Sequence, residues 1–282
     1  MPSPAVIIFE ALVWLAGLVL FWLVTFGRLR RKSPALASWP VSLESFVTGA
    51  LFVAAGGWLL PQVPAHLSNE LLGPAAHDTN WWMLVQGTAF QFGLLGGALL
   101  AGLYLRFQLQ RTPILAESIP SESVSPSQPT RQPLLAGTIT FLISIPLISG
   151  LGLGWKTLLE WFGYSTGEQD MIDLFRNADD PALLVFMIVL AAVIAPITEE
   201  LIFRAGLFRY LRTRVSRGFA LVIPALLFAL LHGNLAAFVP LFALGMFFAL
   251  AYERTGRIAV PMIAHALFNL HTIILVMAGV TA

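Results

Sequence analysis

The sequence predicts an all-α protein that crosses the membrane several times, and composition is the first observation behind this prediction. Of the 282 residues, 57% are hydrophobic and only 11% are charged, whereas an average soluble domain is about 45–50% apolar and about 25% charged. A soluble protein of this composition would expose large apolar patches and aggregate. Disordered chains are poor in apolar residues, so disorder is excluded as well.

Long apolar segments are the second observation. A transmembrane helix requires about 20 mostly apolar residues, and nothing in the chain shows the alternating ten-residue pattern of a membrane barrel. We therefore predict a polytopic integral membrane protein with about eight transmembrane helices, of which the seventh is short. The predicted spans are 5–26, 43–61, 81–105, 134–155, 181–203, 219–236, 238–252 and 258–280.

A polar segment, 112–133, divides the chain and is dominated by Pro and Ser. This composition is typical of a flexible linker. We expect it to lie in the cytoplasm, between an N-terminal three-span region (1–111) and a C-terminal domain (134–282). Nearly all polar residues within predicted spans belong to the C-terminal domain, so we expect the chemistry in its bundle of five helices.

Basic residues predict the orientation of the chain. All of the 16 Lys and Arg residues except Lys156 and Arg176 fall in alternate loops. Because cytoplasmic loops carry the excess of Lys and Arg, both termini are expected outside and the Arg-rich loops in the cytoplasm. The net charge of +1 indicates no nucleic-acid partner, and the lack of Cys excludes disulfides, thiolate metal sites and a cysteine nucleophile.

Several polar residues lie inside predicted spans, where an ionisable group is costly and indicates function. Glu199 and Glu200 end the fifth span, His232 lies in the sixth, and His265 and Asn269 lie in the eighth. We expect the three helices to bring these side chains together.

Helical spacing separates the roles of the two glutamates. Neighbouring residues on a helix differ by about 100°, so Glu199 and Glu200 cannot both face one point. Glu200 and Arg204 are four residues apart and can form an ion pair, which leaves Glu199 to face elsewhere. Phe228 and His232 are also four apart and share a helical face.

These residue types suit peptide-bond hydrolysis. A carboxylate can take a proton from water, while imidazole and amide N–H groups can stabilise the oxyanion of the tetrahedral intermediate. Glu199, His232 and His265 could instead hold a divalent metal such as zinc, because two His and one Glu with an open position form a hydrolytic zinc pattern. The residues alone leave both mechanisms open.

Three motifs carry a resemblance to a known family. An EExxxR motif lies at 199–204, an FxxxH motif at 228–232 and an HxxxN motif at 265–269. In this order, over residues 181–275, they resemble the CAAX protease and bacteriocin-processing (Abi) family of intramembrane proteases. This family includes the type II CAAX prenyl endopeptidases.

The resemblance implies an endopeptidase that cuts near the C-terminus of a membrane-associated or prenylated protein, with lipid and peptide as partners. Glu199 would activate water that His232 helps to hold, while His265 and Asn269 would stabilise the oxyanion. The family is called metal-dependent, and a metal-free glutamate mechanism is also argued for it. The supporting residues would be Glu200, Arg204 and Phe228.

Two other functions remain open. A proton-coupled transporter can use Glu and His inside helices, although transporters often show inverted repeats and the two halves of this chain show none. A non-catalytic immunity or scaffold protein would tolerate substitution of Glu199, His232 and His265.

Three further polar residues are expected to be structural. His271 lies six residues after His265 and so faces away from it. Glu10 and Glu44 lie within about five residues of span ends, from where their carboxylates can reach the membrane interface.

Overall fold

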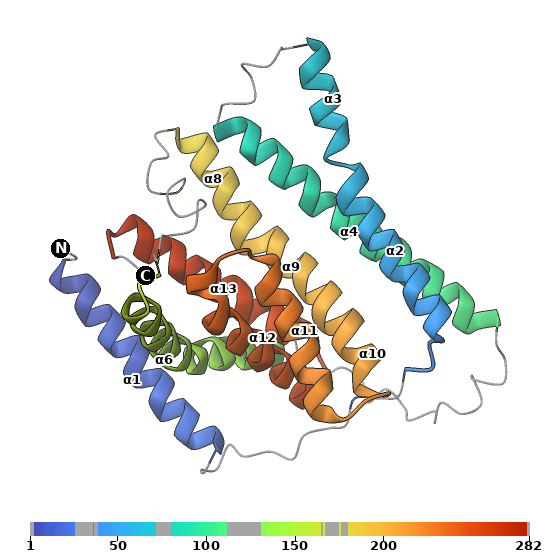
Figure 1. Cartoon of the computed structure of the whole chain (residues 1–282). Coiled ribbons are helices and arrows are strands. Elements are labelled where there is room, and N and C mark those ends of the chain that lie inside the picture. The colour runs from blue at the N-terminus through green and yellow to red at the C-terminus, as the bar shows by residue number, and fades with distance from the viewer. Residues whose placement is uncertain are drawn as a thin grey trace.

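The computed structural model describes residues 3–25, 36, 39–71, 80–111, 131–164, 166, 175 and 180–280. Every regular element within these ranges is a helix, which confirms the predicted all-α fold class (Figure 1). Before residue 162 the helices are α1 (Pro4–Thr25), α2 (Leu43–Leu59), α3 (Gln62–Leu71), α4 (Asn80–Arg111) and α6 (Arg131–Trp161). The later ones are α8 (Pro181–Val189), η2 (Leu190–Ile194), α9 (Ala195–Glu200), η3 (Leu201–Phe208), α10 (Arg209–Arg212), α11 (Arg217–Leu231), α12 (Leu235–Thr255) and α13 (Ala259–Met277).

The spans agree with the predicted ones in order and position, but the third, fourth and fifth extend beyond their predicted ends to Arg111, Trp161 and Arg212, and the sixth and seventh differ more. Seven helical segments of the described chain are long and apolar enough to cross a membrane, and α11 is a shorter apolar helix of 15 residues. The short member of the pair is therefore the sixth span, whereas the seventh forms the 21 residues of α12. Gly233 explains the early end of α11, since its φ of 64° is a left-handed conformation that glycine adopts freely. Asn234 then begins α12 by accepting a hydrogen bond from the Ala237 N–H at 2.9 Å.

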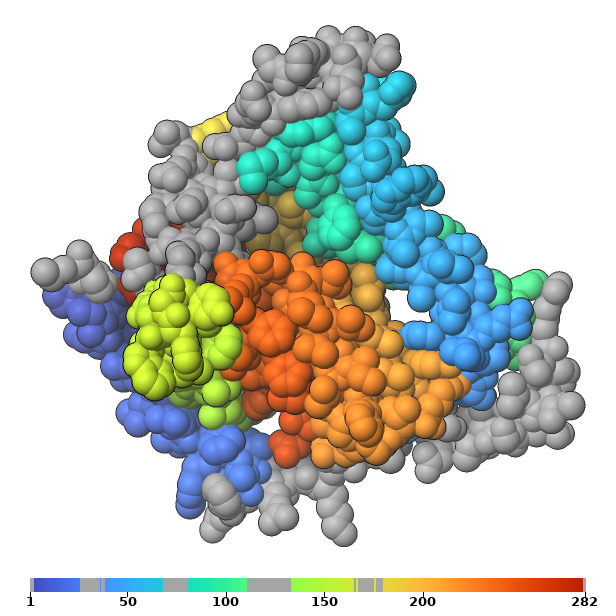
Figure 2. Space-filling model, in the orientation of Figure 1, coloured from blue at the N-terminus to red at the C-terminus, as the bar shows by residue number. Residues whose placement is uncertain are grey.

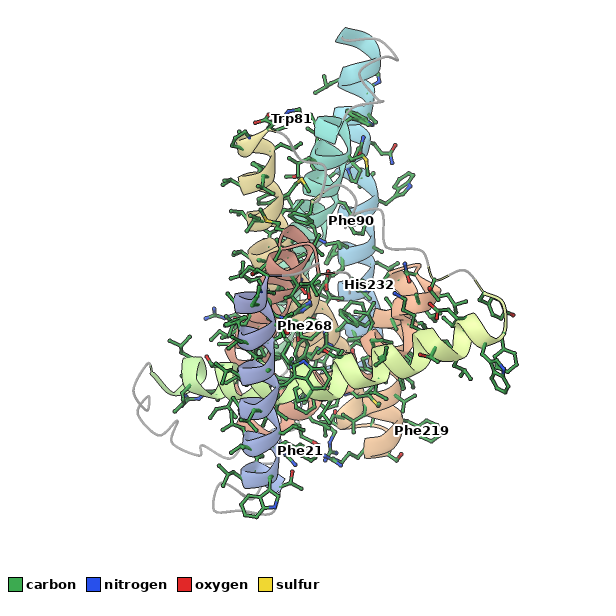
Figure 3. All side chains as sticks on the ribbon, turned by 90° about the vertical axis from the view of Figure 1, so that its left-hand side faces the viewer. Phe21, Trp81, Phe90, Phe219, His232 and Phe268 are labelled. Atoms are coloured by element: carbon green, nitrogen blue, oxygen red, sulfur yellow. The ribbon has the colours of Figure 1, made fainter. Side chains whose placement is uncertain are left out.

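Large apolar side chains cover the outside of the helices. Phe21, Trp81 and Phe219, on three different helices, are all exposed (Figure 3). Water would not tolerate this amount of exposed apolar surface, but lipid does. The chain is an integral membrane protein that crosses the bilayer several times.

The segment 181–212 is one long helix interrupted by two π-helical turns, η2 and η3. Pro196 explains the first of them, because proline has no N–H for the regular helical bond. The pair of glutamates ends the short α9, between the two π-helical segments. π-Bulges of this kind occur frequently at functional sites.

The helices α2 and α4 form a pair with touching backbones. A Cβ atom on Gly56 would lie 2.1 Å from the Gly93 carbonyl oxygen, and one on Gly97 would lie 2.3 Å from that of Phe52. Small residues allow this close approach in membranes. The α2–α4 pair contacts the rest of the bundle through α4 and α9. It also reaches α10, because the rings of Phe46 in α2 and Tyr210 in α10 stack with their centroids 3.8 Å apart. An opening is also visible between α2 and the α10–α11 region (Figure 2).

The remaining helices surround α6 and α13. Helix α6 packs against α1, α12 and α13, and the core between α6, α12 and α13 contains Ile148, Leu244, Phe248 and Ala264. Helix α1 lies on the opposite side of this bundle from the α2–α4 pair (Figure 1). Of the linker predicted over 112–133, residues 112–130 lie outside the described residues, and residues 131–133 form the start of α6 rather than linker. The predicted domain limits and membrane orientation stay predictions.

Candidate active site

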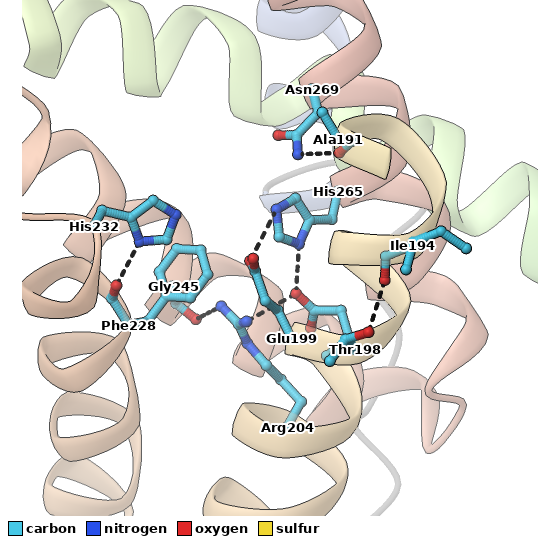
Figure 4. Close-up of polar contacts among 11 residues, drawn as sticks. Ala191, Ile194, Thr198, Glu199, Arg204, Phe228, His232, Gly245, His265 and Asn269 are labelled. Atoms are coloured by element: carbon cyan, nitrogen blue, oxygen red, sulfur yellow. Dashed lines mark hydrogen bonds and ion pairs between the residues drawn. The ribbon is translucent and has the colours of Figure 1, made fainter. Parts of the chain in front are cut away.

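Glu200 lies at the centre of a buried polar cluster. Its side chain is fully buried, and its Oε1 accepts hydrogen bonds from Arg204 Nη1 at 2.8 Å and from His265 Nδ1 at 2.9 Å (Figure 4). The first contact is the ion pair that the four-residue spacing predicts. The second, between residues 65 positions apart, is not visible in the sequence.

Arg204 is held on several sides. It is buried, and its Nη2 donates to the Gly245 carbonyl at 3.2 Å. The guanidinium carbon also lies 4.7 Å from the centre of the Phe228 ring and 5.5 Å from that of Phe248, which are distances for cation–π contacts. Phe228 of the FxxxH motif therefore contacts the cation of the EExxxR motif.

His265 is oriented by its bond to Glu200. Because Nδ1 donates to a carboxylate, the other ring nitrogen, Nε2, is directed to the opposite side. There it lies 3.7 Å from Glu199 Oε2, which is too far for a direct hydrogen bond and is a distance at which a bridging water should be considered. The ring also contacts Phe248, with centroids 5.1 Å apart.

The two glutamates differ in exposure. The Glu199 side chain is 18% exposed, whereas that of Glu200 is 0% exposed. Glu199 is therefore the carboxylate of the pair that a substrate or water can reach. Glu200 serves as the buried partner of Arg204 and His265.

His232 caps the C-terminus of α11 and is exposed. Its Nδ1 lies 2.7 Å from the Phe228 carbonyl oxygen and donates to it, which leaves Nε2 without a proton in the neutral ring. Figure 4 places His232 across a space from Glu199 and His265. No direct hydrogen bond or ion pair joins it to those two described residues.

Asn269 has a partner that the HxxxN motif does not indicate. In η2 the Leu190 carbonyl accepts from the Ala195 N–H, five residues on. By the same spacing the Ala191 carbonyl faces Pro196, which has no N–H to donate. Asn269 Nδ2 supplies the missing donor at 2.8 Å from that oxygen. One of its two amide N–H groups is thus used to join α13 to η2.

The predicted metal trio does not form a ready ligand set. Among the described residues, no three His, Cys, Asp or Glu side chains are grouped closely enough to hold a metal ion. Glu199 and His265 lie near each other, but Nδ1 of His265 is already bonded to Glu200, and His232 stands apart.

This geometry can be compared with known proteins. Residues 181–271, which contain all three motifs, match the family model described as "Type II CAAX prenyl endopeptidase Rce1-like". This part of the chain is similar to that family. The resemblance carried by the three motifs is thereby confirmed over this segment, which comprises the helices from α8 to most of α13.

Two curated relatives are each similar to about a third of the chain or less. A protein of Bacillus subtilis named "Putative membrane peptidase YdiL" is 36% identical over 89 residues, which are 32% of this chain and 36% of the relative. The "Membrane-embedded CAAX protease MroQ" of Staphylococcus aureus is 36% identical over 85 residues, which are 28% of this chain and 34% of the relative. The matched region spans only about a third of each relative's length. No solved structure matches the chain.

Proposed function

We propose that the protein is an intramembrane endopeptidase that hydrolyses a peptide bond near the C-terminus of a membrane-associated or prenylated protein. One observation carries the proposal: the accessible carboxylate of Glu199 faces the free nitrogen of an imidazole that Glu200 holds in place. The Rce1-like segment and the names of its relatives support the same reaction.

In this mechanism Glu199 is the general base. It takes a proton from a water molecule, and the water oxygen forms a bond to the carbonyl carbon of the substrate. Nε2 of His232 accepts the second hydrogen of that water and so helps to orient it. When the tetrahedral intermediate collapses, the C–N bond breaks and the proton on Glu199 moves to the departing amine.

His265 supplies a donor to the oxyanion. When the ring carries a proton on both nitrogens, it donates through Nδ1 to Glu200 and through Nε2 to the developing oxyanion. Asn269 retains a second amide N–H for the same oxygen.

The proposal is tested by following hydrolysis directly. Purified protein in liposomes should cut a lipidated peptide carrying a C-terminal CAAX-type sequence. In water labelled with oxygen-18, mass spectrometry should find one labelled oxygen in the new C-terminal carboxylate, since water is the nucleophile. Failure to cut either the prenylated peptide or its unprenylated counterpart under these conditions would contradict the proposed activity.

Metal removal separates the two mechanisms left open by the sequence. The proposed ligands do not converge as a group of three, so no step above passes through a metal. We expect cleavage to continue at an unchanged rate after dialysis against a chelator. A loss of cleavage that added zinc restores would show that the metal-free route is wrong.

A further inference from the structure

A second pair of ionisable residues lies inside the membrane-spanning helices, away from the candidate active site. His271 Nε2 on α13 lies 2.8 Å from Glu10 Oε1 on α1. The side chains are only 9% and 20% exposed. Glu10 thus does not turn to the membrane interface as expected, because its carboxylate binds a histidine that is 261 positions away in the chain.

The pair lies at matching depth in two antiparallel helices. Glu10 follows the first residue of α1, Pro4, by six positions, and His271 precedes the last residue of α13, Met277, by six. At a rise of 1.5 Å per residue this places both about 9 Å inside the helix ends. Lipid offers no hydrogen bonds at such depth, so each side chain depends on the other.

Helix α1 has a second fixed contact on α6. A Cβ atom on Gly17 would lie 2.2 Å from the Leu142 carbonyl oxygen. Only Val13 and Gly17 are buried among the residues of α1. Phe141 of α6 places its ring at the edge of the His271 ring, with centroids 5.8 Å apart. Helix α1 is therefore anchored to α6 by close packing and to α13 by one polar pair.

The polar pair bears on the orientation of α13. His271 follows Asn269 by two residues, which is about 200° around a helix, so the two side chains leave α13 on nearly opposite sides. Asn269 joins one side to the Ala191 carbonyl of η2, and His271 joins the other side to Glu10. A rotation of α13 would break both contacts, and it would also displace His265 from Glu200.

We propose that Glu10 is a positioning residue of the active site, which acts by fixing α13 through His271. The inference rests on the proposed function, since the quantity it controls is the placement of His265 and Asn269. It assigns a role in the reaction to α1, which lies outside the Rce1-like segment.

The test compares E10L, H271L and E10L/H271L in monodisperse purified protein. We expect each single variant to lower kcat by about 10–100-fold at little changed KM, because small misplacements of catalytic groups have effects of about this size. The double variant should be no worse than either single one, since both remove the same contact. E10Q keeps an acceptor oxygen for His271 and should retain most of kcat. The matched control is E44L, which makes the same change at an exposed glutamate of α2.

The outcomes separate this inference from the proposed function. Wild-type protein that cuts no peptide overturns both. If the wild type is active and E10L has the same kcat, only the role of Glu10 is overturned. The same conclusion follows if the losses of kcat in the single variants add up in the double variant. It also follows if the loss of kcat merely matches the loss of folded protein. If the leucine variants do not fold, kcat is measured in E10D instead, because aspartate keeps the charge but draws the carboxylate back from His271. A kcat equal to wild type in folded E10D would then refute the inference.

Discussion

Replacing Glu199 with glutamine should lower kcat by about 10²–10⁴-fold, the range that a positioned general base contributes. Glutamine has nearly the same shape but cannot accept the proton of the attacking water. Because Glu199 makes no direct hydrogen bond to His265 in this geometry, the buried cluster around Glu200 should stay intact. The thermal unfolding temperature and KM are therefore expected to change little.

Steady-state cleavage of a lipidated peptide in liposomes measures this effect, with E44Q as the control. Glu44 is an exposed carboxylate at the start of α2, outside the polar cluster, so E44Q should keep the wild-type rate. Wild-type kcat in E199Q would remove Glu199 from the mechanism, and the proposal of a glutamate-activated water would go with it.

The buried pair of Glu200 and Arg204 should give the largest effect on stability. R204M leaves the Glu200 carboxylate buried without its cation, and breaking a buried pair in this way costs about 3–5 kcal/mol of folding free energy. Replacing both members by apolar groups is often far less harmful. E200L/R204M should therefore recover much of the thermal stability that R204M loses.

Activity should not recover with it. In E200L/R204M, His265 Nδ1 has lost the acceptor that lies 2.9 Å away in the wild-type protein, so the ring is no longer held with Nε2 toward Glu199. Thermal unfolding and kcat measured on the same preparations separate the two effects. A double variant that is both stable and fully active would show that Glu200 only compensates the charge of Arg204.

The helices were largely predictable because a membrane imposes its own length on apolar segments. What composition could not show was where a backbone leaves the regular helix. Gly233 ends α11 early through a left-handed conformation, and the exchange of lengths between the sixth and seventh spans follows from that single residue.

Within the candidate site, contacts between neighbours on one helix were predictable and contacts between helices were not. The spacing of Glu200 and Arg204 indicates their ion pair, but no spacing indicates that His265 shares the same oxygen. The partner of Asn269 had a signal that could have been used, because Pro196 inside a helix implies a carbonyl without its usual donor. Glu10 and His271 are ionisable residues inside predicted spans, which indicates that each needs a partner, but no spacing in the sequence indicates that they pair with each other.

The glycine contacts between α2 and α4 restrict the paths by which molecules can diffuse through the bilayer to the active site. Where a Cβ atom would already collide with the opposite carbonyl, neither an acyl tail nor an extended polypeptide can pass. Any molecule that moves sideways from the hydrocarbon toward Glu199 must go around this pair of helices, never through it.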